Sequence, residues 1–182
     1  MPNILESTIN TIKSFVDKEP KPPLHIGEAM ACWTYIAALE EAMAYEEAAL
    51  NTTTNGDLKQ AFVDGVKMCN SQITRLKEFM RKEGIPLPPV PEDKPYCDPN
   101  SIPYGVRATD NELANGISLK VAAAIVTCAT AASQSIRNDV GLMFLEFESE
   151  MVIYGGTFKS LMRKHGWIKV PPYFIPPGTP VQ

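Results

Sequence analysis

A proline-rich segment in the middle of the chain, residues 84–109, is the feature that most constrains the fold. A proline has no backbone N–H to donate, so a segment this rich in proline can form neither a helix nor a central strand. Its seven prolines are Pro86, Pro88, Pro89, Pro91, Pro95, Pro99 and Pro103. At about 3.1 Å per residue, an extended segment of this length spans a helix of about 40 Å with slack. We interpret it as a crossover between two helices that point the same way. A domain boundary is the alternative, but each half alone would be only a helical hairpin.

Four stretches with helical spacing of their apolar residues flank the crossover, two before it and two after it. They cover about residues 24–51, 57–83, 110–136 and 139–165. Short turn-forming segments separate the members of each pair, which makes those neighbours antiparallel. Four helices with short, long and short connections are the ferritin-like arrangement. The sequence therefore predicts an all-α, ferritin-like four-helix bundle in a single domain over residues 1–182.

The two ends of the chain carry shorter elements. Residues 3–18 have apolar side chains at helical spacing, which predicts a short amphipathic N-terminal helix. The C-terminal tail contains five prolines among aromatic and aliphatic residues, which favours an extended chain. We expect this tail to lie across the bundle, with Trp167 and Tyr173 or Phe174 as anchors.

Composition narrows the class of protein. The chain has 182 residues and a formal net charge of −4, so it lacks the basic surface that nucleic-acid binding requires. No apolar run reaches the roughly 18 residues of a membrane span, and the N-terminus does not resemble a signal peptide. Four widely spaced cysteines indicate reduced thiols. These features predict a cytoplasmic protein that binds neither nucleic acid nor a membrane.

The first long helix carries two glutamates inside its expected apolar stripe. At about 100° per residue, the stripe consists of Ala29, Cys32, Trp33, Ile36, Met43, Ala44 and Leu50. Glu40 and Glu47 fall near its middle, whereas Glu28, Glu41 and Glu46 fall outside it. A buried glutamate is costly unless it is paired, protonated or bound to a metal. Because few lysines or arginines lie near the inward faces, we expect that one of the two in-stripe glutamates is protonated or that a cation bridges them.

Several segments of the chain resemble an uncharacterised ferritin-like family from spore-forming bacilli, whose members are often described only as hypothetical or as candidate spore coat proteins. The matching stretches are LHIGEAMACWTYIAALEEA, EGIPLPPVPEDKP, ANGISLKVA, SQSIRNDVGLMF and GWIKVPPYFIPPG. They cover about residues 24–178. The resemblance implies a ferritin-like bundle and a sporulation setting, and it brings no catalytic residues with it.

A metal site is one hypothesis for the inward glutamates. A full di-iron site of the ferritin type needs two Glu-x-x-His pairs, and neither His25 nor His165 follows a glutamate by three residues. A smaller site remains open, with Glu40, Glu47, Glu150 and His25 as the ligands of a divalent ion such as Fe, Mn or Zn. The alternatives are a buried polar network and a subunit interface.

No nucleophile elbow, phosphate loop or zinc motif is present, and we assign no catalytic residue. The preferred interpretation is a non-enzymatic bundle with a structural or interaction role linked to sporulation or the spore coat. Its expected partners are copies of itself, in a homo-oligomer, or other spore-associated proteins. Metal binding or redox chemistry at the inward glutamates is the second interpretation. A small-molecule carrier, with a cavity between the third and fourth long helices, is the third.

Overall fold

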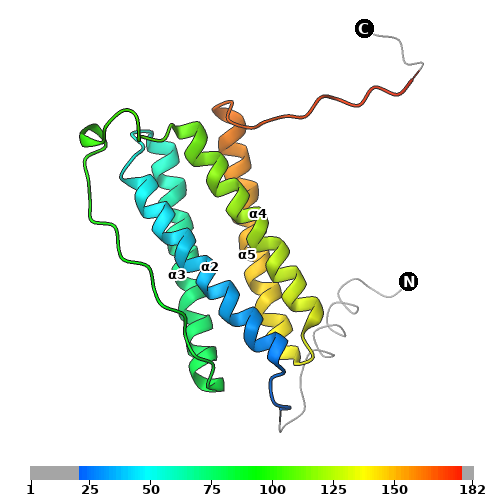
Figure 1. Ribbon diagram of the computed structural model, residues 1–182. Helices are drawn as coiled ribbons and strands as arrows, with labels where there is room; N and C mark the ends of the chain where they lie inside the picture. The colour runs from blue at the N-terminus through cyan, green and yellow to red at the C-terminus, as the bar shows by residue number, and fades with distance from the viewer. Residues whose placement is uncertain (1–20, 178–182) are drawn as a thin grey trace.

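The structure, a computed structural model, describes residues 21–177 and is built from four long helices (Figure 1). They are α2 (Ile26–Leu50), α3 (Gly56–Glu83), α4 (Asp110–Gln134) and α5 (Asn138–Lys164), with a short 3₁₀ helix, η1 (Pro99–Ser101), in the crossover. No strand occurs among these described residues. The all-α, four-helix prediction is confirmed. The N-terminal helix expected at residues 3–18 lies outside the described residues.

The connections set the directions of the helices. A short turn makes α3 antiparallel to α2, and another makes α5 antiparallel to α4 (Figure 1). The crossover returns the chain along the bundle, so α3 and α4 run in the same direction. Helix ends follow the sequence signals: Gly84 ends α3 in the left-handed conformation, with φ of 75°, and Thr109 forms a capping box with Glu112 at the start of α4.

The core between the helices has two apolar clusters. In the larger one, the rings of Tyr35, Phe144 and Phe147 pack against each other with centroids 5.7–6.1 Å apart. In the smaller one, toward the opposite end of the bundle, the rings of Phe62 and Phe158 lie 6.4 Å apart. Aromatic pairs at these separations add to the stabilisation from burial alone.

The crossover is fastened along α2 and α3. The side chain of Asn51 donates to the carbonyl of Pro95 at 2.9 Å and accepts from the backbone N–H of Cys97 at 3.1 Å. Leu87 packs on the larger cluster, and Pro99 is buried. A segment rich in proline loses little entropy when it is ordered, so a few such contacts are enough to hold it.

The C-terminal tail is extended, as expected, but it does not lie across the bundle. Trp167 packs on the smaller cluster and stacks on His165, with centroids 4.4 Å apart. Tyr173 and Phe174 are 88% and 85% exposed, and the chain leads away from the helices (Figure 1). The prediction is wrong for these two anchors, because after Trp167 the chain, with Pro171 and Pro172, runs extended and away from the helices.

Candidate functional site

Helix α2 presents a different face to the core from the one its sequence suggested. Its buried residues are Glu28, Cys32, Tyr35, Ile36, Leu39, Glu40, Glu46 and Ala49. The expected stripe was centred roughly a quarter turn away, since consecutive residues are about 100° apart. Trp33 is 37% exposed, and Glu46, expected outside, lies inside. Alanines, together with the exposed apolar residues Ile26, Met30 and Trp33, cover most of the side of the helix away from this buried set. Apolar residues therefore occur all round α2, and their pattern does not single out one face.

Glu40 and Glu47 face the crossover rather than the centre of the bundle. They line a cavity of about 180 Å³ between α2, α3 and residues 90–93. Lys77 Nζ lies 2.6 Å from Oε1 of Glu40, an ion pair held by charge rather than by hydrogen-bond geometry. Oε2 of Glu47 accepts from the backbone N–H of Lys94 at 3.0 Å. Lys77 thus provides Glu40 with a counter-charge, and neither protonation nor a bridging cation is required there.

Glu150 belongs to a polar network on another side of the core. Its carboxylate accepts from Arg75 Nη2 at 2.6 and 2.7 Å and from Gln72 Nε2 at 2.8 Å. The hydroxyl of Tyr35 donates to the carbonyl oxygen of Gln72 at 2.7 Å. Within this network the polar side-chain atoms of Tyr35, Gln72 and Glu150 therefore all have partners, as a stable network requires.

His25 caps the start of α2, with Nδ1 accepting from the backbone N–H of Gly27 at 3.0 Å. Of the four residues predicted as metal ligands, Glu40 and Glu47 thus share one cavity, whereas Glu150 and His25 lie in two other places, and the structure does not bring the four together. Among residues 21–177, no group of three or more His, Cys, Asp or Glu side chains is placed to hold a metal ion.

Glu28 has a role that the apolar pattern did not reveal. Its carboxylate Oε1 accepts from the backbone N–H groups of Ile136 and Arg137, each at 2.8 Å, where the chain turns from α4 into α5. Oε2 accepts from the backbone N–H of His25 at 3.0 Å and completes the capping box. One buried side chain thus joins the start of α2 to the α4–α5 corner. The spacing of three residues from the N-cap was the signal available in the sequence.

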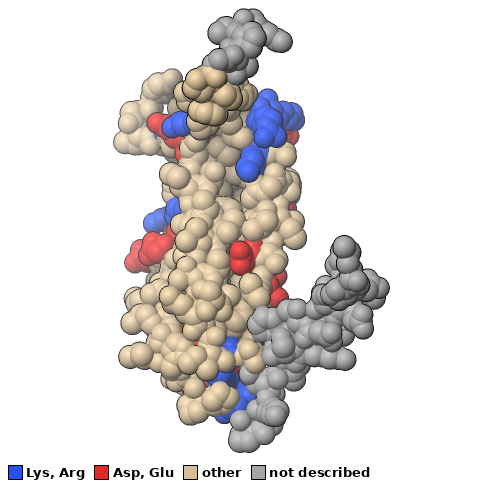
Figure 2. All heavy atoms as spheres, turned by 90° about the vertical axis from the view of Figure 1, so that its right-hand side faces the viewer, with Lys and Arg blue, Asp and Glu red and all other residues tan. Residues whose placement is uncertain are grey.

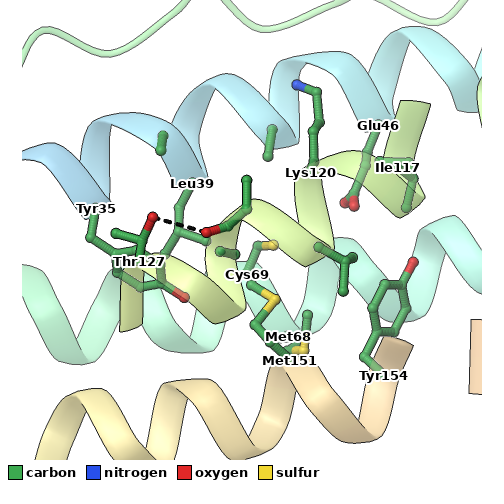
Figure 3. A pocket seen from close by; sticks show the side chains of 15 residues that line it. Tyr35, Leu39, Glu46, Met68, Cys69, Ile117, Lys120, Thr127, Met151 and Tyr154 are labelled. Atoms are coloured by element: carbon green, nitrogen blue, oxygen red, sulfur yellow. Dashed lines mark hydrogen bonds between the residues drawn. The ribbon is translucent and has the colours of Figure 1, made fainter. Parts of the chain in front are cut away.

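A cavity of about 140 Å³ lies inside the bundle and is lined from all four long helices (Figure 3). Most of the lining is apolar, including Leu39, Met68, Ile117 and Met151. It is therefore not confined to the space between α4 and α5, where the sequence suggested a cavity. One acidic side chain, Glu46, lines it.

Glu46 is only 3% exposed, and its Oε2 has no hydrogen-bond partner. Burial raises the pKa of this carboxyl from 4.5 to about 8, and the charge of Lys120 opposes part of that rise. The amine of Lys120 points away from Glu46 (Figure 3) and lies 4.6 Å from the centre of the Tyr45 ring. Glu46 is therefore an acid kept in its neutral form near pH 7 by its surroundings.

Gly65 of α3 allows two polar groups to approach the helix backbone. A Cβ at this position would lie 2.7 Å from the hydroxyl of Tyr154 and 2.9 Å from Oε1 of Glu46. The Tyr154 hydroxyl donates to the backbone carbonyl of Ala61 at 3.0 Å. Burial, followed by the negative charge of Glu46, raises the pKa of Tyr154 well above its usual range, so this hydroxyl stays neutral.

Comparison with known proteins places the chain in a family. Residues 13–179 match the family model described as "Protein of unknown function (DUF3231)". The chain belongs to this family.

The DUF3231 relatives include the uncharacterised protein YvdQ of Bacillus subtilis strain 168, 31% identical over 153 residues, which are 84% of this chain and 90% of that protein. A crystal structure from Bacillus halodurans C-125, of a "putative spore coat protein", is 35% identical with a TM-score of 0.83. That match covers 85% of this chain and 98% of the other. The family resemblance stated from the sequence is confirmed.

A more distant solved structure supports the fold alone. A two-domain protein from Anabaena variabilis with a DJ-1/ThiJ/PfpI-like and a ferritin-like domain is 13% identical with a TM-score of 0.62. The match covers 97% of this chain and 53% of that protein. This likeness agrees with the ferritin-like bundle predicted for this DUF3231 member.

By length and composition alone, α4 is apolar enough to cross a membrane, and no other helix within residues 21–177 meets that test. The same test is passed by core helices of soluble bundles. In this DUF3231 protein α4 packs into the bundle and buries Leu113, Ile117 and Cys128. We therefore interpret α4 as a bundle helix whose other side remains apolar and exposed.

Proposed function

We propose that the protein is a non-enzymatic helical bundle with a structural or interaction role in the spore, and that it acts by self-association through the exposed face of α4. The relative from Bacillus halodurans, whose description names the spore coat, supports the setting. The exposed face of α4 supports the mode of action and carries the proposal.

The exposed side of α4 has a regular apolar pattern. Leu119 is 73% and Val126 is 65% exposed, and the small exposed residues Ala122 and Ala129 fall between and after them. These positions are spaced three and four residues apart, as in the seam of a coiled coil. Only 22% of the most apolar 18-residue stretch of α4 is buried, so this helix has apolar surface that a partner could cover.

Helix α5 extends this face. Gly155 lies against Val121 of α4, so that side of α5 borders α4. Val152, three residues earlier and 51% exposed, lies on the same side. Figure 2 views the molecule from the side on which α4 and α5 lie, and the middle of that side is mostly uncharged, with acidic side chains in a small part of it. Apolar patches of this kind on a soluble protein mark interaction sites.

The charge pattern favours a second copy of this chain as the partner. In a two-fold symmetric dimer each face meets its own copy, so a charged face would bring like charges together. From Leu113 to Gln134 the only charged residue is Lys120. Its amine is directed to the Tyr45 ring and to the carbonyl oxygen of Glu41, 3.4 Å away, and so toward α2. The stripe itself is uncharged and can meet its copy without repulsion.

Sedimentation of the wild type and of a Val126→Glu variant tests this proposal. We expect a dimer for the wild type and a folded monomer for the variant, because the new carboxylates would face each other across the two-fold axis. Ile26→Glu is the matched control, since Ile26 is 87% exposed on α2, away from this face, and its replacement should leave the dimer intact. A wild-type protein that stays monomeric at high micromolar concentration, or a Val126→Glu dimer as stable as the wild type, would overturn the proposal.

Metal binding at Glu40, Glu47, Glu150 and His25 is supported less well by the geometry. The first three carboxylates are engaged by Lys77, by the backbone N–H of Lys94 and by Arg75, and His25 caps a helix. We therefore do not adopt the metal interpretation as a second function.

A further inference from the structure

The cavity at the centre of the bundle is large enough for a small organic molecule. Its volume of about 140 Å³ is close to the roughly 150 Å³ of an apolar protein cavity that takes up benzene. Ala38 of α2 and Ala123 and Thr127 of α4 line it and are exposed to solvent. These small side chains form a mouth at the seam between α2 and α4, so a ligand has a route into the cavity.

The polar groups around the cavity leave one acceptor unused. The Tyr154 hydroxyl donates to Ala61, and Thr127 Oγ1 donates to the carbonyl of Ala123 at 2.9 Å (Figure 3). Glu46, by contrast, is only 3% exposed. Its side chain points into the interior, and its Oε2 has no hydrogen-bond partner. A buried carboxyl oxygen without a partner costs free energy that a ligand with a suitable donor would recover.

We propose that this cavity binds a small organic cation, a primary ammonium on a compact apolar body about the size of a benzene ring. The ammonium would donate to Oε2 of Glu46, and the body would contact the apolar side chains of Leu39, Ile117 and Met151. An anion brings no N–H or O–H donor for Oε2, and it would be repelled by Glu46 in its ionised form. A neutral apolar molecule would leave Oε2 without a donor.

The other titratable groups near the cavity do not offer the ammonium a second charge, so Glu46 alone would pair with it. Burial raises the pKa values of Cys69 on α3 and Tyr154 on α5 far above neutrality, so both stay uncharged. Lys120 on α4 is the nearest cation, with its pKa lowered by burial, and its amine faces Tyr45 and not the cavity. Because Glu46 is mostly protonated near neutral pH, formation of an ion pair with the ammonium displaces its proton to solvent. Binding should therefore release close to one proton.

Titration calorimetry with benzylammonium chloride and with benzyl alcohol, its neutral analogue, tests the proposal on the wild-type protein. We expect one benzylammonium per chain, bound about tenfold or more tightly than benzyl alcohol, the factor for one charged hydrogen bond. Repeating the titration near pH 7 in two buffers of different ionisation enthalpy measures the proton release. Equal affinity for the two compounds, or no binding of either, would overturn the proposal.

Two variants and a control assign the effect to the site. Glu46→Gln keeps the shape of the side chain, so it should weaken benzylammonium by about tenfold or more and retain benzyl alcohol. Ala42→Leu, which fills part of the cavity, should weaken both compounds. Glu47→Gln lies outside the cavity and should change neither affinity. Benzylammonium bound equally by the wild type and the Glu46→Gln protein, or weakened as much by Glu47→Gln, would contradict the assignment.

Discussion

Replacing Glu46 with glutamine should stabilise the protein at pH 8 and leave it nearly unchanged near pH 4.5. In the folded chain the carboxyl is buried without a partner, and its pKa rises from 4.5 to about 8. In the unfolded chain it is solvated and ionises at its ordinary pKa. Between these two pH values the folded state retains a proton that the unfolded state has lost.

The sign and size of the effect follow from proton linkage. Stability falls as pH rises wherever the folded state binds more protons than the unfolded state. The favourable contribution is complete below pH 4.5 and is lost as pH rises to about 8, an interval of 3.5 pH units from 8 minus 4.5. At about 1.4 kcal/mol per unit, the loss reaches about 5 kcal/mol as an upper limit. Glutamine carries no ionisable proton and avoids this loss.

Urea denaturation of both proteins from pH 5 to pH 9 measures the difference in free energy of unfolding. Other titrating groups cancel because the two proteins share them. The advantage of the Glu46→Gln protein should grow steadily up to about pH 8 and then level off. Glu41→Gln, an exposed change on the same helix, serves as the control and should not reproduce this growing advantage. A Glu46→Gln difference that is flat across this range would show that the carboxyl is solvated or paired.

Three further predictions concern Gly65, Glu28 and the C-terminal tail. Gly65→Ala should lower the free energy of unfolding by about 1–3 kcal/mol, because its Cβ would clash with the Tyr154 hydroxyl and the Glu46 carboxyl. Gly156→Ala, with open space around its Cβ, should instead raise the free energy of unfolding by up to about 1 kcal/mol, as measured by chemical denaturation. Glu28→Ala should cost about 2–5 kcal/mol, because the buried backbone N–H of Arg137 and the partly buried one of Ile136 lose their acceptor at the α4–α5 corner. Glu41→Ala should cost almost nothing in the same assay. Deleting residues 169–182 should leave the melting temperature within about 2 °C of the wild type, because residues 169–177, the part of the deleted segment that the structure describes, are exposed. A large drop would mean that the tail packs on the bundle.

Sequence alone predicted the architecture because the signals for it are local. The prolines of residues 84–109 force an extended crossover, and its length fixes the parallel course of α3 and α4. In α3 the buried set, which includes Phe62, Ile73 and Met80, follows the helical spacing of the apolar residues, because the opposite face carries charged residues. A clear contrast between two faces of a helix is sufficient to orient it.

The candidate site could not be predicted in the same way. Around α2 apolar residues occur on every side, with Ile26, Met30, Trp33 and alanines opposite the buried set, so the orientation of the helix depends on which neighbours pack closely. That choice places Glu46 inside and turns Glu47 to the crossover, although they are adjacent in the sequence. Whether a carboxylate has a partner depends on side chains from other helices, such as Lys77 for Glu40, and no spacing within α2 reveals them.

The small residues of α4 connect the proposed interface with the proposed ligand site. Ala122 and Val126 belong to the exposed stripe, and the residues that directly follow them, Ala123 and Thr127, line the mouth of the cavity. Consecutive residues project about 100° apart, so the mouth opens beside the stripe. A second copy seated on the stripe would therefore border the route of the ligand. If dimerisation narrows that route, it should slow both entry and release of the ligand. If it also lowers the affinity for the ligand, linkage requires the bound ligand to weaken the dimer by the same factor. Small side chains on α4 thus have two effects. On one side of the helix they leave space for the cavity and its mouth, and on the other they form the exposed apolar stripe.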